Sequence, residues 1–494
     1  MKNKSIDWNK IGTIIIYSIP NLLILFVFYS NRSLFLDGLN LARNVAEGSF
    51  SDISQPLKYE QSAPILFLYL SKISTLIFGV SEYSLRLLPL ISGLGCLFFF
   101  KSTIDKLLSS KYVLLGVFCL GTHAMFIRYA TEYKQYMTDA LVSILLIWLA
   151  LKLSKLSKKN TIIIGLCGTI AIWLSMPSIF ILVGLICYYV HIQYTNRDSQ
   201  FPTIILATWF TINFALEYFF ILSPAISSEH MQNFHHNYFI QGTFWEPNSF
   251  QHDYGLIISM IRMAVGKSGL AIAAAVALTS ICIYDFIRNR KSIGLLIFLP
   301  ILAVFGASLL GKYSLIERLM LFTLPLLFIL ILLGLQILVE KLKNKKPILK
   351  YSILGIIGLS LLVGFSQTQG FKYLSDPLEI EDNRTSLIYI DKHEKHANSI
   401  VCTQLAYPAY AYYSNYDKNL KSLNIGIAIA AKYDDSVIEL AINQCKKDKD
   451  DVWVLMGHML DHEITNLISK LDKAGTIKNS YRTNRSAAIL FSTQ

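Results

Sequence analysis

Charged residues are scarce in this chain. Asp, Glu, Lys and Arg make up only 16% of its 494 residues, whereas hydrophobic residues account for 53%. Soluble globular domains carry about 25% charged residues. This deficit excludes an ordinary soluble protein, although the length alone would suggest about three soluble domains. We therefore expect most of the chain to lie in a lipid bilayer.

Several motifs that would indicate other chemistry are also missing. The seven cysteines form no Cys-x-x-Cys pair, no His/Cys zinc spacing occurs, and there is no internal repeat. Five of the cysteines lie in or near apolar runs, where they serve as small packing residues. Whether the other two, Cys402 and Cys445, pair is left open, because a disulfide needs an oxidising compartment and a suitable geometry.

Long apolar runs are what the sequence has instead. Residues 11–30, 202–222 and 319–338 each have about the 20 residues that a helix needs to cross a bilayer. The first run follows several lysines but lacks a clear small-x-small cleavage site, so we predict an uncleaved first span. In all we predict about eleven spans, near residues 11–30, 85–100, 112–127, 138–153, 160–176, 178–194, 202–222, 268–286, 292–310, 319–339 and 350–367.

The net charge of +12 is concentrated in short loops between these spans. Cytoplasmic loops of membrane proteins are enriched in Lys and Arg. With the N-terminus inside, all of the lysine-rich loops fall on the cytoplasmic side, so the basicity indicates topology and argues against nucleic acid as a partner. The loops are residues 101–111, 152–159, 288–291 and 341–350. We predict a multi-pass protein of the cytoplasmic (inner) membrane with an outer C-terminus.

Two regions follow from this topology. Residues 1–367 form a membrane module with outer loops at 31–84 and 223–267, and the apolar stretch at 62–79 is predicted to be a helix lying in the membrane interface. Residues 368–494 regain normal polarity and contain the strand candidates "NSIVC", "DVWVLMGH" and "SAAILFST". The predicted fold is mainly α, with a small extracytoplasmic α/β domain at the C-terminus.

Two acids at the predicted outer edge of the membrane are the first candidates for chemistry. Ionisable groups near a membrane are costly, so they are functional candidates by default. Asp37 follows the first span, and Asp139 opens the span near 138–153. Each has a simpler interpretation as a helix N-cap. The two interpretations are compatible, because a capping carboxylate can also face a cavity.

Five stretches give the sequence a recognisable pattern. They are "LDGLNLARNVAEGSF", "LKYEQSAPILFLYLSKISTLIFGVSEYSLRLLPLISG", "RYATEYKQYMTDAL", "WLSMPSIFIL" and "YSLIERLMLFTLPLLFIL". In this order they are spread over most of residues 1–340. The chain thereby resembles the GT-C superfamily of membrane glycosyltransferases, in particular the bacterial family 39-type branch related to protein O-mannosyltransferases and to the aminoarabinose transferase of lipid A.

The chain departs from that pattern in places. Asp37 is followed by Gly38, where many relatives have a second acid. Glu60-Gln61 stands where the aminoarabinose branch has Glu-Lys-Pro, so a phosphate-binding lysine is missing and aminoarabinose is a doubtful sugar. The C-terminal region also lacks the β-trefoil domain of eukaryotic O-mannosyltransferases.

The resemblance implies transfer of a sugar from a polyprenyl-phosphate donor to a protein, lipid or glycan acceptor at the outer face. Asp37 would be the base that takes the acceptor proton, and Asp139 would orient the acceptor or share that role. The departing phosphate needs cations in a site of low dielectric. The candidates are Arg86, Arg128, Lys134 and Arg318 for the phosphate, and Glu60, Glu132, Tyr136 and Trp245 for the rest of the substrate.

Simpler interpretations stand beside these roles. Glu132 and Lys134 can pair with each other or with Arg128, and Arg318 can extend toward lipid headgroups. A divalent metal is left open, with Glu60 and His235 as candidate ligands. The C-terminal residues His458, Asp461 and His462 are interpreted as a solvated loop.

Other functions also stay in view. A transporter or flippase would show paired halves and broken spans, and no such duplication is visible. A glycan ligase or polymerase would be expected to have its large outer loop late in the chain, and an envelope scaffold would not need acids and cations at one depth. Residues 368–494 have two open roles, acceptor recognition or a structural lid.

Overall fold

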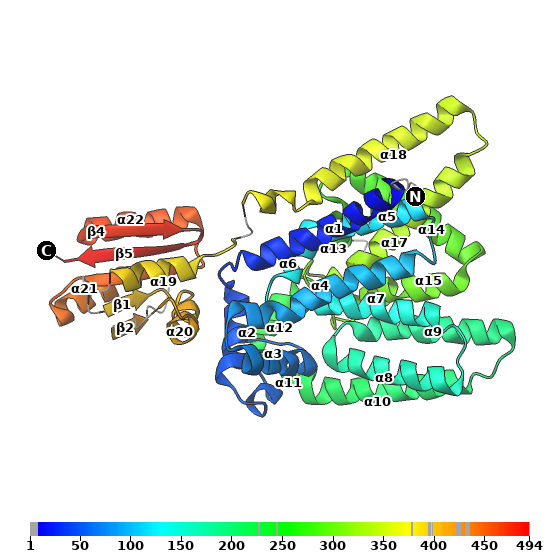
Figure 1. Cartoon of the computed structure of the whole chain (residues 1–494). Coiled ribbons are helices and arrows are strands. Elements are labelled where there is room, and N and C mark those ends of the chain that lie inside the picture. The colour runs from blue at the N-terminus through cyan, green and yellow to red at the C-terminus, as the bar shows by residue number, and fades with distance from the viewer. Residues whose placement is uncertain are drawn as a thin grey trace, which may run out of the picture.

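The computed structural model describes residues 8–225, 228–243, 246–376, 379–393, 397, 399–420, 426–429 and 435–493. Figure 1 shows a large body of helices and, at one end of it, a smaller part that contains a β-sheet. The predicted combination of a mainly α membrane part with a small C-terminal α/β part is confirmed.

Apolar helices account for every predicted span. They are α1 (Trp8–Tyr29), α4 (Glu82–Ile104), α5 (Ser110–Gly121), α7 (Tyr136–Lys152), α8 (Lys158–Leu174), α9 (Ser178–Asn196), α10 (Phe201–Glu217), α14 (Gly269–Arg288), α15 (Lys291–Ile297), α16 (Leu299–Leu309), α17 (Leu324–Leu342) and α18 (Pro347–Thr368). The predicted span near 112–127 is broken, because α5 ends at Gly121 and a separate helix, α6 (Ala124–Ala130), follows.

Fewer helices count as spans when both their length and their hydropathy are considered. Within the described residues, seven helices are long and apolar enough to cross a membrane, or eight if α15 and α16, which meet at 46°, form one bent span. Helices α5, α7 and α8 have only 12, 17 and 17 residues. A multi-pass membrane protein is confirmed, and the count of eleven stays a prediction.

Helix α17 lies at the centre of the bundle. In its span window, 78% of the residues are buried, compared with 11% for α18. Helix α14 crosses α17 so closely that a Cβ on Gly334 would come within 2.0 Å of the carbonyl oxygen of Leu278. This contact therefore requires glycine.

Further helices lie between the spans in sequence or directly after the last one. They are α2 (Leu36–Glu47), η1 (Asp52–Ser54), α3 (Ile65–Phe78), η2 (Tyr218–Leu222), α11 (Ser223–Ala225), α12 (Glu229–His236), α13 (Pro247–Val265), η3 (Leu321–Thr323) and η4 (Phe371–Leu374). Helix α3 occupies the stretch that was predicted to lie in the membrane interface. Helices α2 and α3 lie at the end of the bundle nearest the sheet (Figure 1).

The C-terminal part is a five-stranded sheet with helices on both faces. Its elements are α19 (Asn383–Lys392), β1 (Ser399–Cys402), α20 (Tyr407–Tyr416), β2 (Gly426–Ile429), α21 (Asp435–Asp448), β3 (Val452–Gly457), α22 (Asp461–Ala474), β4 (Thr476–Thr483) and β5 (Ser486–Ser492). The strand order is β2-β1-β3-β5-β4. Strand β1 runs parallel to β2 and β3, and β5 runs antiparallel to β3 and β4. The three strand candidates correspond to β1, β3 and β5.

A separate hydrophobic cluster lies on each face of this sheet. One face packs with α19 and α20 and shares its cluster with α2 and α3. The other packs with α21 and α22. Cys402 belongs to the first cluster and Cys445 to the second, and both are free thiols. The pairing that the sequence left open is therefore not formed, because the two side chains lie on opposite sides of the sheet.

Candidate functional site

Asp37 is held by an arginine from a distant part of the chain. The N-cap of α2 is Phe35, so the interpretation of Asp37 as the N-cap is wrong. Its Oδ2 lies 3.2 Å from Nη1 of Arg318, and both side chains are about one-third exposed. Arg318 follows α16, so the pair joins the segment after α1 to a segment late in the chain. Arg318 thus has a partner within the protein.

Tyr136 connects this pair to the second predicted acid. It is the first residue of α7 and is buried. Its side chain interacts electrostatically with Arg318, Asp37 and Asp139. Tyr136 therefore lies within electrostatic range of both predicted acids.

Asp139 is more enclosed than its sequence position suggested. The helix begins three residues earlier, at Tyr136, with Gln135 as the N-cap, so Asp139 does not cap α7. Its side chain is next to the hydroxyl of Ser175, and the residue is only 5% exposed. Among the described residues, its Oδ1 has no hydrogen-bond partner. Asp139 is therefore a buried neighbour of Tyr136 and not a solvent-facing acid.

Glu217 is an acid that the sequence analysis missed. It ends α10, is 1% exposed and interacts electrostatically with Asp139. Neither of its carboxylate oxygens has a hydrogen-bond partner within the part of the chain that the structure describes. A single acid inside the apolar run at 202–222 is the signal that marks it, whereas the acids predicted from the sequence lie at span edges.

The loop before α7 is fixed by Arg32. Its Nη2 donates to the carbonyl oxygen of Thr131 at 2.8 Å and lies 3.3 Å from Oε2 of Glu132. Burial lowers the pKa of Arg32 to about 10, and Glu132 acts in the opposite direction. Glu132 is thus paired with Arg32, a partner that the sequence analysis did not consider.

Lys134 is a buried cation beside the Asp37–Arg318 pair. Its Nζ donates to Oε1 of Gln61 at 2.7 Å. Burial lowers the pKa of Lys134 to about 8; Asp37 and Glu132 favour its charged form and Arg318 disfavours it. Lys134 therefore shares one electrostatic environment with Asp37 and Arg318.

The other two predicted phosphate ligands lie differently. Arg86 is 1% exposed, and its guanidinium donates to the carbonyl oxygens of Arg32 and Ser33 at 2.6 and 3.0 Å. It holds backbone and is not directed to the acids. The guanidinium of Arg128 lies 5.2 Å from the ring centre of Tyr129.

Glu60 and His235 are the two candidate metal ligands. Glu60 is exposed and adopts a left-handed backbone with φ of 53°. Nδ1 of His235 lies 2.7 Å from the hydroxyl of Ser314, and burial together with Arg318 lowers the pKa of this histidine. Within the described residues, no group of three or more His, Cys, Asp or Glu is placed to hold an ion. Trp245 lies outside the described residues.

Comparison with solved structures defines the fold. The crystal structure of ArnT from Cupriavidus metallidurans in the apo state matches with 13% identity and a TM-score of 0.54, covering 98% of each chain. The same protein bound to undecaprenyl phosphate matches with 12% identity and a TM-score of 0.52, covering 97% of this chain and 98% of that one. The chain therefore has a GT-C-like fold.

Part of the chain also matches a known protein family. Residues 62–219, from α3 to η2, match the dolichyl-phosphate-mannose-protein mannosyltransferase family. A search of curated proteins gave no match. The predicted resemblance to the GT-C superfamily of membrane glycosyltransferases is confirmed.

Proposed function

We propose that this protein transfers a sugar from a polyprenyl-phosphate donor to an acceptor hydroxyl at the outer face of the cytoplasmic membrane. The observation that carries the proposal is the ion pair between Asp37 and Arg318, with Lys134 beside it, at one end of a bundle of apolar helices. The ArnT structure with bound undecaprenyl phosphate supports a lipid-phosphate donor for this fold.

Asp37 is the proposed base. Its carboxylate is about one-third exposed, so an acceptor can reach it. The acceptor oxygen forms a bond to the anomeric carbon while its proton passes to Asp37. The bond from that carbon to the phosphate oxygen breaks, and its electron pair leaves with the lipid phosphate. A positioned carboxylate contributes about 10²- to 10⁴-fold to such a proton transfer.

Arg318 and Lys134 are the proposed phosphate ligands. Arg318 carries a donor next to Asp37, and the Asp37 carboxylate favours the charged form of Lys134, so charge that develops on the phosphate would meet cations in a partly dry site. Lys134 also reaches Gln61, which stands where the aminoarabinose branch has a lysine. In this chain the cation near that position thus comes from a different segment. Arg86 leaves the proposed ligand set because its guanidinium is occupied by backbone carbonyls.

Asp139 is proposed to orient and not to accept the proton. It is almost fully buried, and an acceptor would have to displace packed side chains to reach it. Its position beside Tyr136 suits a residue that holds the tyrosine against the reacting groups.

The test replaces Asp37 by Asn and measures transfer from a radiolabelled polyprenyl-phosphate sugar in membranes. We expect at least a 100-fold loss of turnover with normal protein levels. Asp52→Asn is the matched control, because Asp52 lies in the same outer segment and its carboxylate accepts hydrogen bonds from nearby Ser49. If Asp37→Asn keeps full turnover, or if the protein moves the lipid-linked sugar without transferring it, the proposal is wrong.

A further inference from the structure

The residues that connect α1 to α2 are held by the C-terminal part of the chain. We call residues 31–35 the linker. Nη2 of Arg384 donates to the carbonyl oxygen of Asn31 at 2.6 Å. The backbone N–H of Ser33 donates to Oε1 of Glu379 at 2.9 Å. These contacts join positions about 350 apart in sequence, so the linker is part of a long-range interface.

Tyr413 makes the central contact. Its hydroxyl accepts a hydrogen bond from the backbone N–H of Leu34 at 2.7 Å and lies 3.2 Å from the hydroxyl of Ser33. The tyrosine is completely buried. One residue further on, the ring of Phe35 lies 5.3 Å from the ring of His458.

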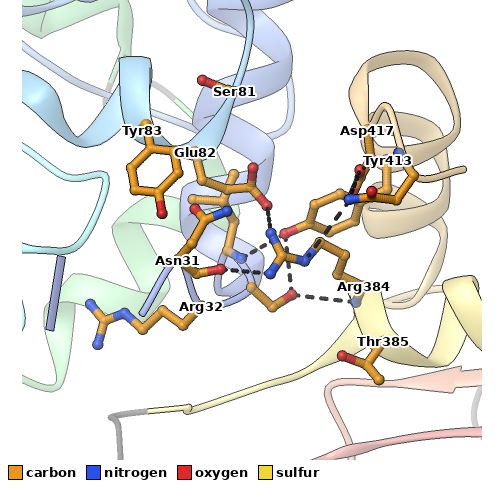
Figure 2. A network of polar contacts seen from close by, with 12 residues as sticks. Asn31, Arg32, Ser81, Glu82, Tyr83, Arg384, Thr385, Tyr413 and Asp417 are labelled. Atoms are coloured by element: carbon orange, nitrogen blue, oxygen red, sulfur yellow. Dashed lines mark hydrogen bonds and ion pairs between the residues drawn. The ribbon is translucent and has the colours of Figure 1, made fainter. Parts of the chain in front are cut away.

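Arg384 ties the linker to a membrane helix as well. Figure 2 shows its guanidinium between Asn31, Glu82 and Asp417. Nη1 lies 2.6 Å from Oε1 of Glu82, in the first turn of α4, and Nε lies 4.0 Å from Asp417. One side chain on α19 thereby fixes the linker, α4 and α20 relative to one another.

The membrane part of the chain also forms hydrogen bonds with the linker. Arg86 of α4 donates to the carbonyl oxygens of Arg32 and Ser33. The side chain of Arg32 in turn binds Thr131 and Glu132. Because the linker leads directly into α2, any shift of its backbone moves Asp37, which lies in the first turn.

We propose that Tyr413 and Arg384 are positioning residues that set the place of Asp37 against Arg318 through the linker. This inference rests on the proposed role of Asp37 as the base. It gives residues 368–494 a defined task, in which they act on the catalytic end of the bundle through backbone contacts. A small misplacement of a reacting group is enough to slow catalysis severely.

The first test is Tyr413→Phe, which removes one hydroxyl and keeps the ring. The N–H of Leu34 then loses its acceptor. We expect kcat to fall roughly tenfold, whereas the KM for the donor changes little because the phosphate ligands are untouched. Hydrogen exchange should become faster in the peptide that contains Ser33 and Leu34.

Tyr389→Phe is the matched control. Its hydroxyl donates a hydrogen bond to Oδ1 of Asn479 at 2.9 Å, inside the C-terminal part. We expect kcat and the exchange rate of the linker peptide to stay at the wild-type values in this variant. If kcat falls as much in Tyr389→Phe as in Tyr413→Phe, the effect comes from a general loosening of the C-terminal part and not from the linker. That result would overturn the proposal.

A second pair of variants keeps the test decisive if Tyr413→Phe does not fold. Arg384→Lys retains a charge for Glu82 but cannot also reach Asn31 with a planar fork. Arg384→Ala retains neither. We expect kcat to decrease in the order wild type, Lys, Ala, with donor KM nearly constant. Arg482→Ala is the control, since Arg482 contacts Asp461 within the same part.

The two proposals fail in different ways. If Asp37→Asn is inactive while Tyr413→Phe and Arg384→Ala fold with a faster-exchanging linker and normal kcat, the positioning role is wrong and the base survives. If Asp37→Asn is fully active, the proposed base is wrong, whatever the linker variants do.

Discussion

Arg318 places Nη1 3.2 Å from Oδ2 of Asp37, although 281 positions separate the two residues in the sequence. Both side chains are about one-third exposed, so the pair contributes at most about 1 kcal/mol to stability. The main effect of the ion pair is therefore to orient the carboxylate of Asp37. The guanidinium restricts the carboxylate and keeps a cation beside the position proposed for the leaving phosphate.

Replacing Arg318 should harm catalysis and leave folding intact. We expect Arg318→Ala to lower kcat/KM by about 100-fold, the size of effect seen when one charge-stabilising donor is lost. Arg318→Lys should lose less, because it keeps the charge without the fork. Arg43→Ala is the control, since Arg43 pairs with Glu47 on α2. Wild-type kcat/KM in Arg318→Ala would remove this arginine from the site.

Lys134 predicts a pH dependence of donor binding. Its pKa in the free protein is lowered to about 8 by burial, so its positive charge is lost as the pH rises through 8. We expect donor affinity to fall above about pH 8 in the wild type. In Lys134→Arg this fall should vanish, because arginine stays charged. An affinity that declines equally in both proteins would show that Lys134 is not the titrating ligand.

The lowered pKa of Lys134 also makes the stability of the protein depend on pH. An unfolded lysine releases its proton near 10.5, whereas folded Lys134 releases it near 8. Between these values the unfolded state binds more protons, so the contribution of Lys134 makes the protein more stable as the pH rises. The difference in unfolding midpoint between wild type and Lys134→Arg should therefore change in this window.

The regular structure was largely predictable because it follows from local pattern. Apolar runs identified the span helices, and continuous apolar stretches identified β1, β3 and β5. Strand β4 was missed because it lies at the edge of the sheet, where its residues "TIKNSYRT" alternate between exposed and half-buried. A polar edge strand is specified by its pairing with β5 and not by its own composition.

The site was predictable only as a set of candidates. An apolar chain has few charges near the span ends, so Asp37, Lys134 and Arg318 stood out. Their partners depend on which loops meet in three dimensions, and the sequence does not contain that information locally. Arg86 shows the limit, because the same residue type in the same region holds backbone instead of facing the acids.

Glu217 and Asp139 should behave as a coupled pair. Both are buried and interact electrostatically, and unpartnered buried charge is costly. We expect Glu217→Gln to unfold at a temperature no lower than the wild type. The effects of Glu217→Gln and Asp139→Asn on stability should be non-additive by at least about 0.5 kcal/mol, as for residues in contact.

A double-mutant cycle measured by thermal unfolding in one detergent checks this coupling. Asp285→Asn, on α14, is the control acid, since it bonds to Asn289 and Arg290 and not to this pair. Its effect should add to that of Glu217→Gln. Additive effects for Glu217 and Asp139 would mean that the two carboxylates do not influence each other.

The two ends of the bundle should lie on opposite sides of the membrane. The loop between α17 and α18 is lysine-rich, which favours the cytoplasmic side, and the C-terminal sheet lies at the other end of the bundle, beside α2 (Figure 1). Leu460 and Lys345 are exposed at these two places. We expect Leu460→Cys to react with a membrane-impermeant maleimide in intact cells. Lys345→Cys should react only after the membrane is opened, and the reverse pattern would invert the topology and put the proposed site on the cytoplasmic face.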